Sequence, residues 1–313
     1  MDNIIDTGYM DTLLPRLAEA DIDVSLFYEV KASLSKEEIR RLSAAGVDRI
    51  QPGIESLNTE ILRLMRKGTT AAQNIQLLKW CFDYNITPAW NLLYAFPGER
   101  AEQYSELPRI LRTIMHLNPP AGINPVVFER FSPYHFDREK FKLTLKPIGY
   151  YSMLYPEQMV DFDKIAYYFE GKWEGRENVE EYIAPTQEVY AQWEETWESK
   201  KVFFNYEKGP GFVTLYDNRP LEPGNKLSTR RIKLNEAQSS IFLFCDHIQS
   251  FSTIQKMLND KFKSPPTVEQ TRTMLDHFTR HGLMFREADR YLSLAVRRKK
   301  PQVGNRESNS QNN

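Results

Sequence analysis

The chain has 313 residues, of which 41% are hydrophobic and 27% charged, a composition typical of a globular protein of about two domains. Its formal net charge of −1 gives no electrostatic case for a nucleic-acid or anionic-membrane partner. No apolar run approaches the roughly 18 residues needed to cross a bilayer, and no charged-then-apolar signal opens the chain, so we expect a cytoplasmic protein that meets small molecules or other proteins.

The first 131 residues alternate between strand and helix patterns. Strands are predicted at 23–30, 49–54, 88–96 and 126–131, and helices at 9–20, 35–45, 59–65, 71–84 and 102–117, the fourth of them capped by Thr69 or Thr70. Strands separated by helical patterns imply parallel pairing with right-handed crossovers. Four consecutive parallel strands make an incomplete barrel or an open sheet. Because residues 2–6 resemble the end of a strand, we expect a barrel that lacks its first strands.

The second part of the chain, from Lys146, is rich in tyrosine and tryptophan. Most of these aromatic side chains are expected to pack helices such as the one predicted at 189–197. Residues 202–206 and 212–216 flank a Gly-Pro-Gly turn and predict a hairpin, and the proline-rich stretch 217–225 is predicted to be a linker.

The third part begins near Leu227 and predicts three helices, starting at Asn235, Ser252 and Thr267, followed by two short strands that turn at 288–289. This order is typical of a winged helix, a module that binds DNA or proteins, and the unremarkable net charge favours protein. The polar tail is predicted to be disordered.

The predicted fold is therefore α/β. We divide the chain into the later part of a barrel at 1–145, an aromatic-rich extension with a hairpin and linker at 146–226, a winged-helix-like domain at 227–298 and a disordered tail at 299–313.

Four polar residues stand near the carboxyl ends of the predicted strands. Glu29 lies late in one strand, Glu55 follows the next, Lys67 closes the helix after it, and Asn91 is on the following strand. In a parallel barrel these ends converge on one mouth, where active sites are built. Taken singly, Lys67 also suits a helix-end charge before Gly68, and Glu55 suits a solvated loop. Together they suit a zwitterionic, ribose-bearing ligand, and S-adenosylmethionine has those groups.

Only two cysteines are present, Cys81 and Cys245. Each lies in an amphipathic helical pattern, so we expect both to be core residues. The sequence therefore predicts no disulfide framework and no metal site formed by this chain.

Several segments also resemble one family closely. They are DNIID, LLPRLAE, LFYEVKASL, AGVDRIQPGIESLN, LRLMRKGTT, NIQLLKWC, WNLLYAFPGE and ERFSPYH. In this order they resemble the cobalamin-dependent radical SAM C-methyltransferases that mature ribosomal peptides, closely over residues 1 to about 170 and more loosely beyond. The resemblance implies a radical SAM barrel, in which Glu29 lies near the ligand's amino group, Glu55 and Asn91 near the ribose, and Lys67 near the methionyl carboxylate.

The sequence departs from that family in one large respect. Family members carry a cobalamin-binding domain and then a CxxxCxxC loop that holds a [4Fe-4S] cluster. This chain has no such triplet, and Ala95 stands where a glycine is more usual before the Phe-Pro-Gly-Glu turn. The chain thus resembles the C-terminal portion of such an enzyme.

The function implied is part of a peptide C-methylating radical enzyme. In the whole enzyme the cluster cleaves S-adenosylmethionine reductively, and a methyl group passes from methylcobalamin to an unactivated carbon of a ribosomal precursor peptide. A separate polypeptide bearing CxxxCxxC then supplies the missing half. The alternatives are a non-catalytic scaffold that binds a peptide through the winged-helix-like domain, or an inactive truncated remnant.

Overall fold

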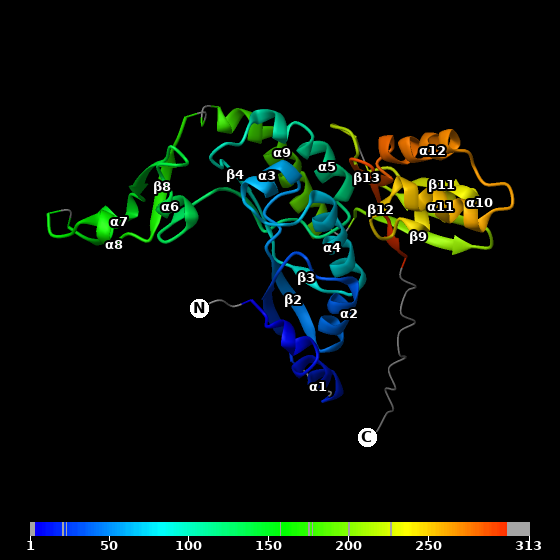
Figure 1. Ribbon diagram of the computed structural model, residues 1–313, viewed down its shortest axis with the longest axis horizontal. Helices are drawn as coiled ribbons and strands as arrows, with labels where there is room; N and C mark the ends of the chain where they lie inside the picture. Colours follow the sequence, from blue (N-terminus) through cyan, green and yellow to red (C-terminus); the bar gives the residue numbers. More distant parts are fainter. Residues whose placement is uncertain are drawn as a thin grey trace, which may run out of the picture.

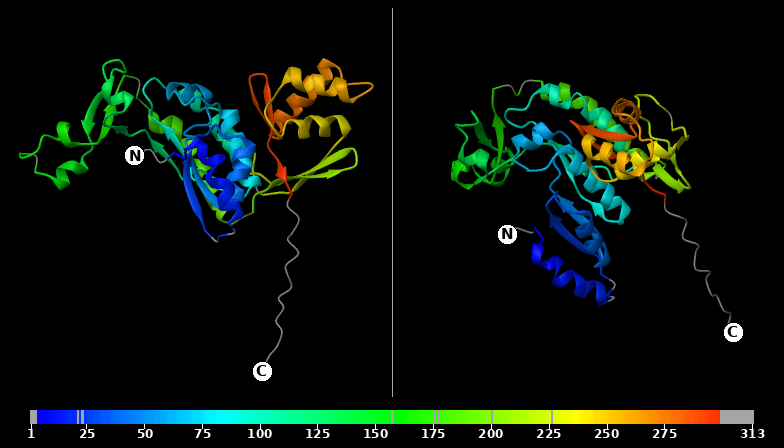
Figure 2. Two further views of the ribbon diagram at one scale, coloured as in Figure 1. Left: turned by 60° about the horizontal axis from the view of Figure 1, so that its bottom comes forward. Right: turned by 45° about the vertical axis from the view of Figure 1, so that its right-hand side comes forward.

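The computed structural model describes residues 4–20, 22, 24–156, 158–174, 176, 178–199, 201–225 and 227–298. Figure 1 shows a parallel α/β part in the middle, an arm at one end formed around β8, and a C-terminal module at the other. The two further views in Figure 2 keep the arm and the C-terminal module on opposite sides of this central part. The tail predicted at 299–313 lies outside the described residues.

The central part contains a parallel sheet, as the sequence predicts. Its strands are β1 (Leu26–Val30), β2 (Val47–Pro52), β3 (Thr87–Pro88), β4 (Asn91–Tyr94) and β5 (Gly122–Pro125). β1, β2 and β3 pair in that order, and β4 pairs with β5. Parallel bridges from Ile4 to Glu29 and from Glu55 to Leu92 extend the first sheet and join it to the second. The alternation of strand and helix dictates this arrangement.

The helices of the central part cover one face of the sheet. They are η1 (Thr7–Met10), α1 (Leu13–Glu19), α2 (Lys36–Ala44), α3 (Thr59–Leu64), α4 (Ala71–Asp83), η2 (Ala101–Tyr104) and α5 (Leu107–Ile114). Ser35 and Thr70 form complete capping boxes at the starts of α2 and α4, which confirms those two predicted helix starts.

The last of the four predicted parallel strands, which corresponds to β5, is not where the sequence predicts it. It runs over Gly122–Pro125, and residues 126–131 contain instead the short strand β6 (Phe128–Glu129), which pairs antiparallel with β8 in the arm. The prediction placed the strand too late in the chain because Val126–Phe128 is the more apolar run. Pro125 is tolerated because it ends an edge strand, where its missing N–H breaks no ladder.

The arm has a small hydrophobic core of its own. Its other elements are α6 (Pro133–Phe136), β7 (Thr144–Pro147), α7 (Tyr150–Leu154), α8 (Phe162–Ile165) and β8 (Tyr168–Lys172). The core residues, from Phe128 to Phe169, lie on both sides of the boundary predicted at 145/146. That boundary stays a prediction.

The C-terminal module follows the long helix α9 (Val179–Glu198). A four-stranded sheet in the order β11-β10-β9-β15 is formed by β9 (Phe204–Gly209), β10 (Phe212–Asp217), β11 (Arg230–Leu234) and β15 (Val296–Arg297). It is followed by α10 (Glu236–Phe244), β12 (Gln249–Ser250), α11 (Phe251–Lys261), α12 (Val268–Arg280), β13 (Met284–Glu287) and β14 (Arg290–Ser293). The predicted hairpin, three helices and final two strands are all present. Their assignment as a winged helix stays a prediction.

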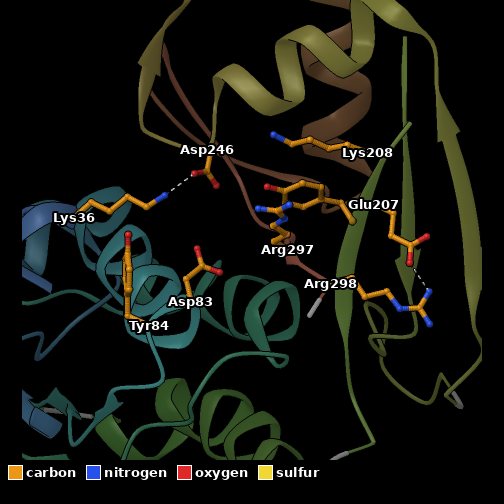
Figure 3. A pocket seen from close by; sticks show the side chains of 9 residues that line it. Lys36, Asp83, Tyr84, Glu207, Lys208, Asp246, Arg297 and Arg298 are labelled. Carbon is orange, nitrogen blue, oxygen red and sulfur yellow. Dashed lines mark hydrogen bonds and ion pairs between the residues drawn. The ribbon is translucent and has the colours of Figure 1, made fainter. Parts of the chain in front are cut away.

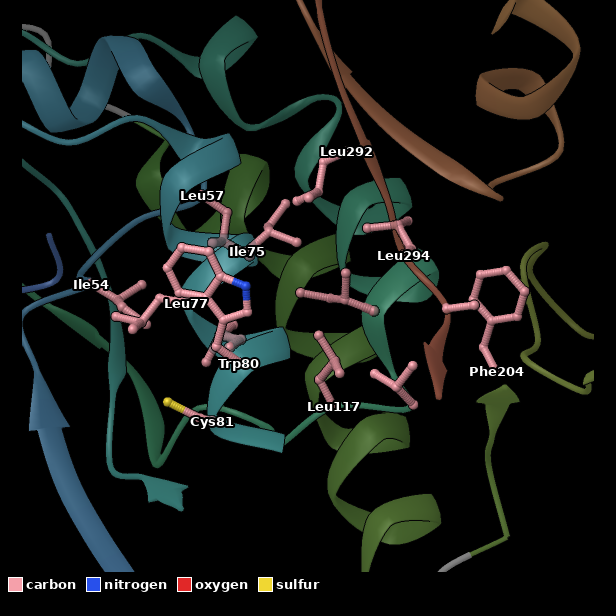
Figure 4. Packing of buried hydrophobic residues seen from close by; sticks show 14 of the residues in the cluster. Ile54, Leu57, Ile75, Leu77, Trp80, Cys81, Leu117, Phe204, Leu292 and Leu294 are labelled. Atoms are coloured by element: carbon pink, nitrogen blue, oxygen red, sulfur yellow. The ribbon is translucent and has the colours of Figure 1, made fainter. Parts of the chain in front are cut away.

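One large hydrophobic core joins the central part to the C-terminal module. Ile75 and Trp80 of α4 belong to the same buried cluster as Leu292, Leu294 and Phe204, and Figure 4 shows residues of this cluster. Cys81 and Cys245 are both fully buried, as the sequence predicts. The stretch predicted as a linker begins inside this core.

The start of that stretch is held by a buried ion pair. Arg219 donates to both carboxylate oxygens of Asp217 at 2.9 Å, and its guanidinium also reaches the carbonyl oxygens of Thr113 and Gly282. Both side chains of the pair are fully buried. A buried charge must be paired to be tolerated, so these contacts fix the end of β10 between α5 and α12.

The buried side chain of His116 gives this core a pH dependence. Its Nε2 lies 2.9 Å from the carbonyl oxygen of Leu294, which can only accept, so Nε2 carries the proton. Burial, and then the nearby Arg219 charge, lower the pKa of His116 to about 3. We therefore predict that stability falls as the pH drops below about 6.5, because only the unfolded chain takes up this proton.

The measurement is urea unfolding at pH 7 and pH 5 for the wild type and for His116→Gln, whose amide keeps a donor for Leu294. The wild type should lose ~2 kcal/mol more than the variant over this interval. An equal loss in both proteins would contradict the assignment.

Candidate ligand-binding site

The parallel sheet leaves one face open, and this face carries the predicted polar residues. In β1 and β2 the partners Phe27 and Arg49, and Glu29 and Gln51, lie on the same side of the sheet. Phe27 is 47% exposed, whereas Ile50 on the opposite side is fully buried under the helices. The open face therefore offers polar groups to a ligand.

Glu55 stands at the carboxyl end of β2 in an unusual backbone conformation. Its φ is +58°, which few residues other than glycine adopt, and its carbonyl oxygen accepts from the N–H of Leu93 at 2.9 Å. This turn ends the strand and directs the chain toward α3. Such backbone strain is characteristic of functional sites.

The buried amide of Asn74 holds the Glu55 turn from behind. Its Nδ2 donates to the carbonyl oxygens of Ile54 at 3.1 Å and Ser56 at 2.9 Å, the two residues that flank Glu55. Asn74 lies in the first turns of α4 and is fully buried. The helix thus fixes the backbone on both sides of the strained residue.

Lys67 faces Glu55 across the loop. Its N–H donates to the carbonyl oxygen of Leu62 at the end of α3, and its Nζ lies 3.2 Å from Oε1 of Glu55. The side chains of Lys67 and Glu55 remain 33% and 23% exposed. Gly53 lies beneath, where a Cβ would come within 3.4 Å of the ammonium group. The two charges are paired and still open to a ligand.

A pocket of about 250 Å³ adjoins this pair. Its polar wall is formed by Glu55, Arg66 and Lys67, and its apolar wall comes from α3, β4 and the arm, as Leu64, Met65, Leu93, Phe96, Pro133, Tyr134 and Phe141. Charged groups on one side and apolar side chains on the other are what small-molecule sites present.

Asn91 and Glu29 lie on the same open face but farther from the pair. Asn91 is two residues before the pocket residue Leu93 and therefore shares its face of β4. Glu29 is two strands away, and one step lower along the sheet, which places its Cα roughly 12 Å from that of Asn91 by strand geometry. The structure brings Glu55 and Lys67 into contact and places Asn91 on the same open face. It shows no contact between Glu29 and these three, so only an extended ligand could reach all four.

The Pro-Gly-Glu turn after β4 is fixed by Glu99. Its carboxylate accepts from the N–H groups of Ala95 and Phe96, each at 2.8 Å, from the hydroxyl of Tyr104 at 2.6 Å, and from that of Tyr182. Ala95 has a φ of +64°, which explains why a glycine is the more usual residue at this position.

Asn74 and Glu99 are site residues that the sequence did not single out. Asn74 looks like an ordinary polar residue of an amphipathic helix, and only the fold shows that it meets the turn at 54–56. Glu99 stands in a recognisable turn motif, so the motif itself was the available signal.

The cysteines do not fit an iron–sulfur cluster. Burial raises the pKa of both thiols, that of Cys245 to about 12, and the two residues lie on α4 and at the end of α10. A [4Fe-4S] cluster needs several thiolates that meet at one point, and here there are two buried thiols on separate elements. Within the described part of the chain, no group of three or more His, Cys, Asp or Glu is placed to hold a metal ion.

A second cavity, of about 900 Å³, separates α2 and α4 from the C-terminal module. Figure 3 shows Asp246 directed toward Lys36 on one side of this cleft and Glu207 paired with Arg298 on the other. Asp246 also contacts the buried Lys79 at 3.3 Å. Burial alone raises the pKa of Asp246, but the Lys79 charge and the Lys36 hydrogen bond lower it to about 2. Of these ion pairs, the contacts of Asp246 with Lys36 and Lys79 join the C-terminal module to α2 and α4.

Comparison with known proteins identifies the central part. The sequence model of the Radical SAM superfamily matches residues 7–109. This range includes Glu29, Glu55, Lys67 and Asn91, so all four lie within a radical SAM superfamily domain. No curated protein matches the chain.

Three solved structures of radical SAM enzymes have low similarity to this chain. TsrM from Kitasatospora setae, a radical S-adenosylmethionine methyltransferase solved with tryptophan substrate and a SAM analog, is 16% identical over 59% of this chain and 40% of its own, with a TM-score of 0.42. The cobalamin-dependent enzyme OxsB is 13% identical over 62% of this chain and 36% of its own, with a TM-score of 0.33.

Coproporphyrinogen III oxidase (HemN) from Escherichia coli is 14% identical over 92% of this chain and 71% of its own, with a TM-score of 0.36. The chain thus spans well under half the length of the two proteins described above and about 70% of this one. Among the described residues, no helix is long and apolar enough to cross a membrane.

The Asn74 clamp makes a testable prediction. Asn74→Asp removes the amide group that donates to the carbonyl oxygens of Ile54 and Ser56 and buries a carboxylate against them. We expect a loss of about 3 kcal/mol or more in the free energy of unfolding, measured in urea at pH 7.

The same substitution at Asn259 is the matched control. Asn259 is exposed on α11 and uses its oxygen to accept from Gln255, a role that a carboxylate can keep. This variant should change stability by less than about 0.5 kcal/mol. Equal effects at the two positions would show that Asn74 does not clamp the turn.

Proposed function

On the premise of the radical SAM superfamily domain at residues 7–109, we propose that the chain binds S-adenosylmethionine at the Glu55–Lys67 pair and serves a peptide C-methyltransferase. The observation that carries this proposal is the contact between these two side chains at the carboxyl ends of β2 and β4, beside a pocket of about 250 Å³. Those strand ends are where parallel barrels place their ligands.

The chemistry of the ligand matches the groups on this edge. The ammonium of Lys67 would take the methionyl carboxylate, and the Glu55 carboxylate would accept from ribose hydroxyls. Each group now satisfies the other, so binding exchanges one ion pair for two charge-assisted contacts. The side-chain amide of Asn91, on the same face, would accept a hydrogen bond from the ribose or donate one to it. Glu29, farther along the open face, would bind the ligand's amino group.

The ligand's adenine and thioether parts need apolar surroundings. Leu93 and Phe96 from the central part, and Tyr134 and Phe141 from the arm, supply a wall of this kind next to the charged pair. In this proposal the arm closes one side of the site and excludes water from it.

The described residues of this chain offer no suitable ligands for the cluster of such an enzyme, and the proposal assigns no cobalamin contact to them. Its two thiols are buried and on separate elements, so the proposal places the CxxxCxxC loop and the cobalamin-binding domain on other polypeptide sequence. The cluster, when bound there, would supply the electron for cleavage of S-adenosylmethionine. The residues of this chain bind and orient that ligand.

A ribosomal precursor peptide is the proposed substrate, and the cytoplasm is the proposed location. The arm beside the pocket exposes large apolar side chains, among them Phe131 at 66%, Phe136 at 67% and Met153 at 86%. Exposed apolar surface of this extent is typical of binding surfaces. The winged-helix-like elements of the C-terminal module are a second proposed contact for the peptide, and they would serve equally in the non-catalytic scaffold that is the alternative function.

The test is binding of S-adenosylmethionine to the full chain, measured by isothermal titration calorimetry. The wild type should bind, and Lys67→Ala and Glu55→Gln should each weaken binding by about tenfold or more, because each removes a charge-assisted contact of ~1.5–3 kcal/mol. Lys256→Ala, an exposed lysine on α11, is the matched control and should bind as the wild type does.

Two outcomes would overturn the proposal: a wild-type chain that binds none of the ligand, or binding that the two site variants and the control weaken equally.

Co-expression with a CxxxCxxC-bearing polypeptide then distinguishes the enzyme function from the scaffold function. The enzyme function predicts 5′-deoxyadenosine from the reduced pair, and a pair that holds iron and forms none of it supports the scaffold.

A further inference from the structure

The hairpin of the C-terminal module reaches the loop that carries Glu55 and Lys67. Glu287, at the end of β13, accepts a hydrogen bond from the hydroxyl of Thr59, and its other oxygen lies 3.4 Å from the N–H of Ala72. Thr59 is the first residue of α3, and Ala72 is in the first turn of α4. One carboxylate, separated from these residues by more than 200 positions in sequence, thus joins the starts of both helices.

Thr59 itself connects the two helices. Its hydroxyl donates to Glu287 and accepts from the N–H of Ala71 at 2.8 Å. The segment between these contacts, residues 60–70, contains α3, Lys67 and the cap of α4. Glu287 and Thr59 therefore fasten both ends of the loop that holds Lys67.

The same helix turn supports Glu55. Two residues after Ala72, Asn74 donates to the carbonyl oxygens on either side of Glu55. Glu287 and the Glu55 turn are therefore both hydrogen-bonded to the start of α4.

The hairpin is itself fixed against α4. The ammonium of Lys79 is buried and donates to the carbonyl oxygen of Ser293, the last residue of β14, and Gln76 accepts from the N–H of Ile248 at 2.7 Å. Glu287 thus comes from a rigid support, so its carboxylate is held near the helix starts. A negative charge is favourable there because the first N–H groups of a helix are unpaired.

We propose that Glu287 is a positioning residue for the ligand site: it holds the 59–72 segment so that Lys67 and Glu55 face each other across the pocket. The C-terminal module is then part of the ligand site's framework, and displacement of its hairpin by a bound partner would loosen the site. The ligand part of this inference rests on the proposed function.

The test uses the full chain and two readouts. Hydrogen exchange measured by mass spectrometry should show exchange about fivefold faster in Glu287→Gln over residues 53–72, where the hydrogen bonds to the carboxylate are weakened. Exchange in the remainder of α4, in α5 and in α10 should not change. The same variant should bind S-adenosylmethionine severalfold more weakly.

Matched variants separate positioning from general destabilisation. Asp276→Asn removes the ion pair with Arg286 on the same hairpin, 3.1 Å long and exposed, and should leave both readouts unchanged. Thr59→Val should speed exchange in the same segment at least as much as Glu287→Gln does, and Thr59→Ser should not. The double variant Glu287→Gln, Thr59→Val should show less than the sum of the two single effects, because the two groups share one contact.

Faster exchange throughout the chain, or additive effects of Glu287→Gln and Thr59→Val, would overturn the inference. A wild type that binds no S-adenosylmethionine would refute the proposed function alone. The exchange measurement would still decide whether Glu287 holds the segment.

Discussion

The candidate site depends on one buried amide. Asn74 donates to the carbonyl oxygens of Ile54 and Ser56, and so holds Glu55 at a φ of +58° at the end of its strand. Together with the bond from the N–H of Leu93 to the carbonyl oxygen of Glu55, these two bonds offset a conformation that costs about 1 kcal/mol or more. The Glu55 turn directs the chain into α3. After that helix, Nζ of Lys67 lies 3.2 Å from Oε1 of Glu55. The geometry of the charged pair is thus set by a residue that touches neither charge.

Local sequence patterns predicted most of the helices and strands. Capping boxes at Ser35, Thr70, Asn235 and Thr267 mark helix starts that the structure confirms. Alternating apolar residues mark β1, and apolar content interrupted by glycine marks the end of β2. These signals are encoded within a few residues of one another, which is why a single sequence carries them.

Features that depend on distant residues were not visible in the same way. The fourth parallel strand was placed too late because Val126–Phe128 is the more apolar stretch, whereas pairing with β4 selects Gly122–Pro125. The stretch from Asp217 contains turn-forming residues, yet Arg219 is buried through contacts with α5 and the end of α12. Asn74 and Glu287 gain their roles only from partners that the fold brings to them. The position of Glu55 and Lys67 could be predicted, but not what holds them.

The account's central claim is that the Glu55–Lys67 pair opens to receive S-adenosylmethionine. A crystal structure of the chain with S-adenosylhomocysteine tests it most directly. We predict that the ligand lies across the carboxyl ends of β2 and β4, with its carboxylate on Lys67 and its ribose hydroxyls on Glu55, and that the direct contact between the two side chains is replaced. A ligand bound elsewhere, with Lys67 still paired to Glu55, would contradict the claim.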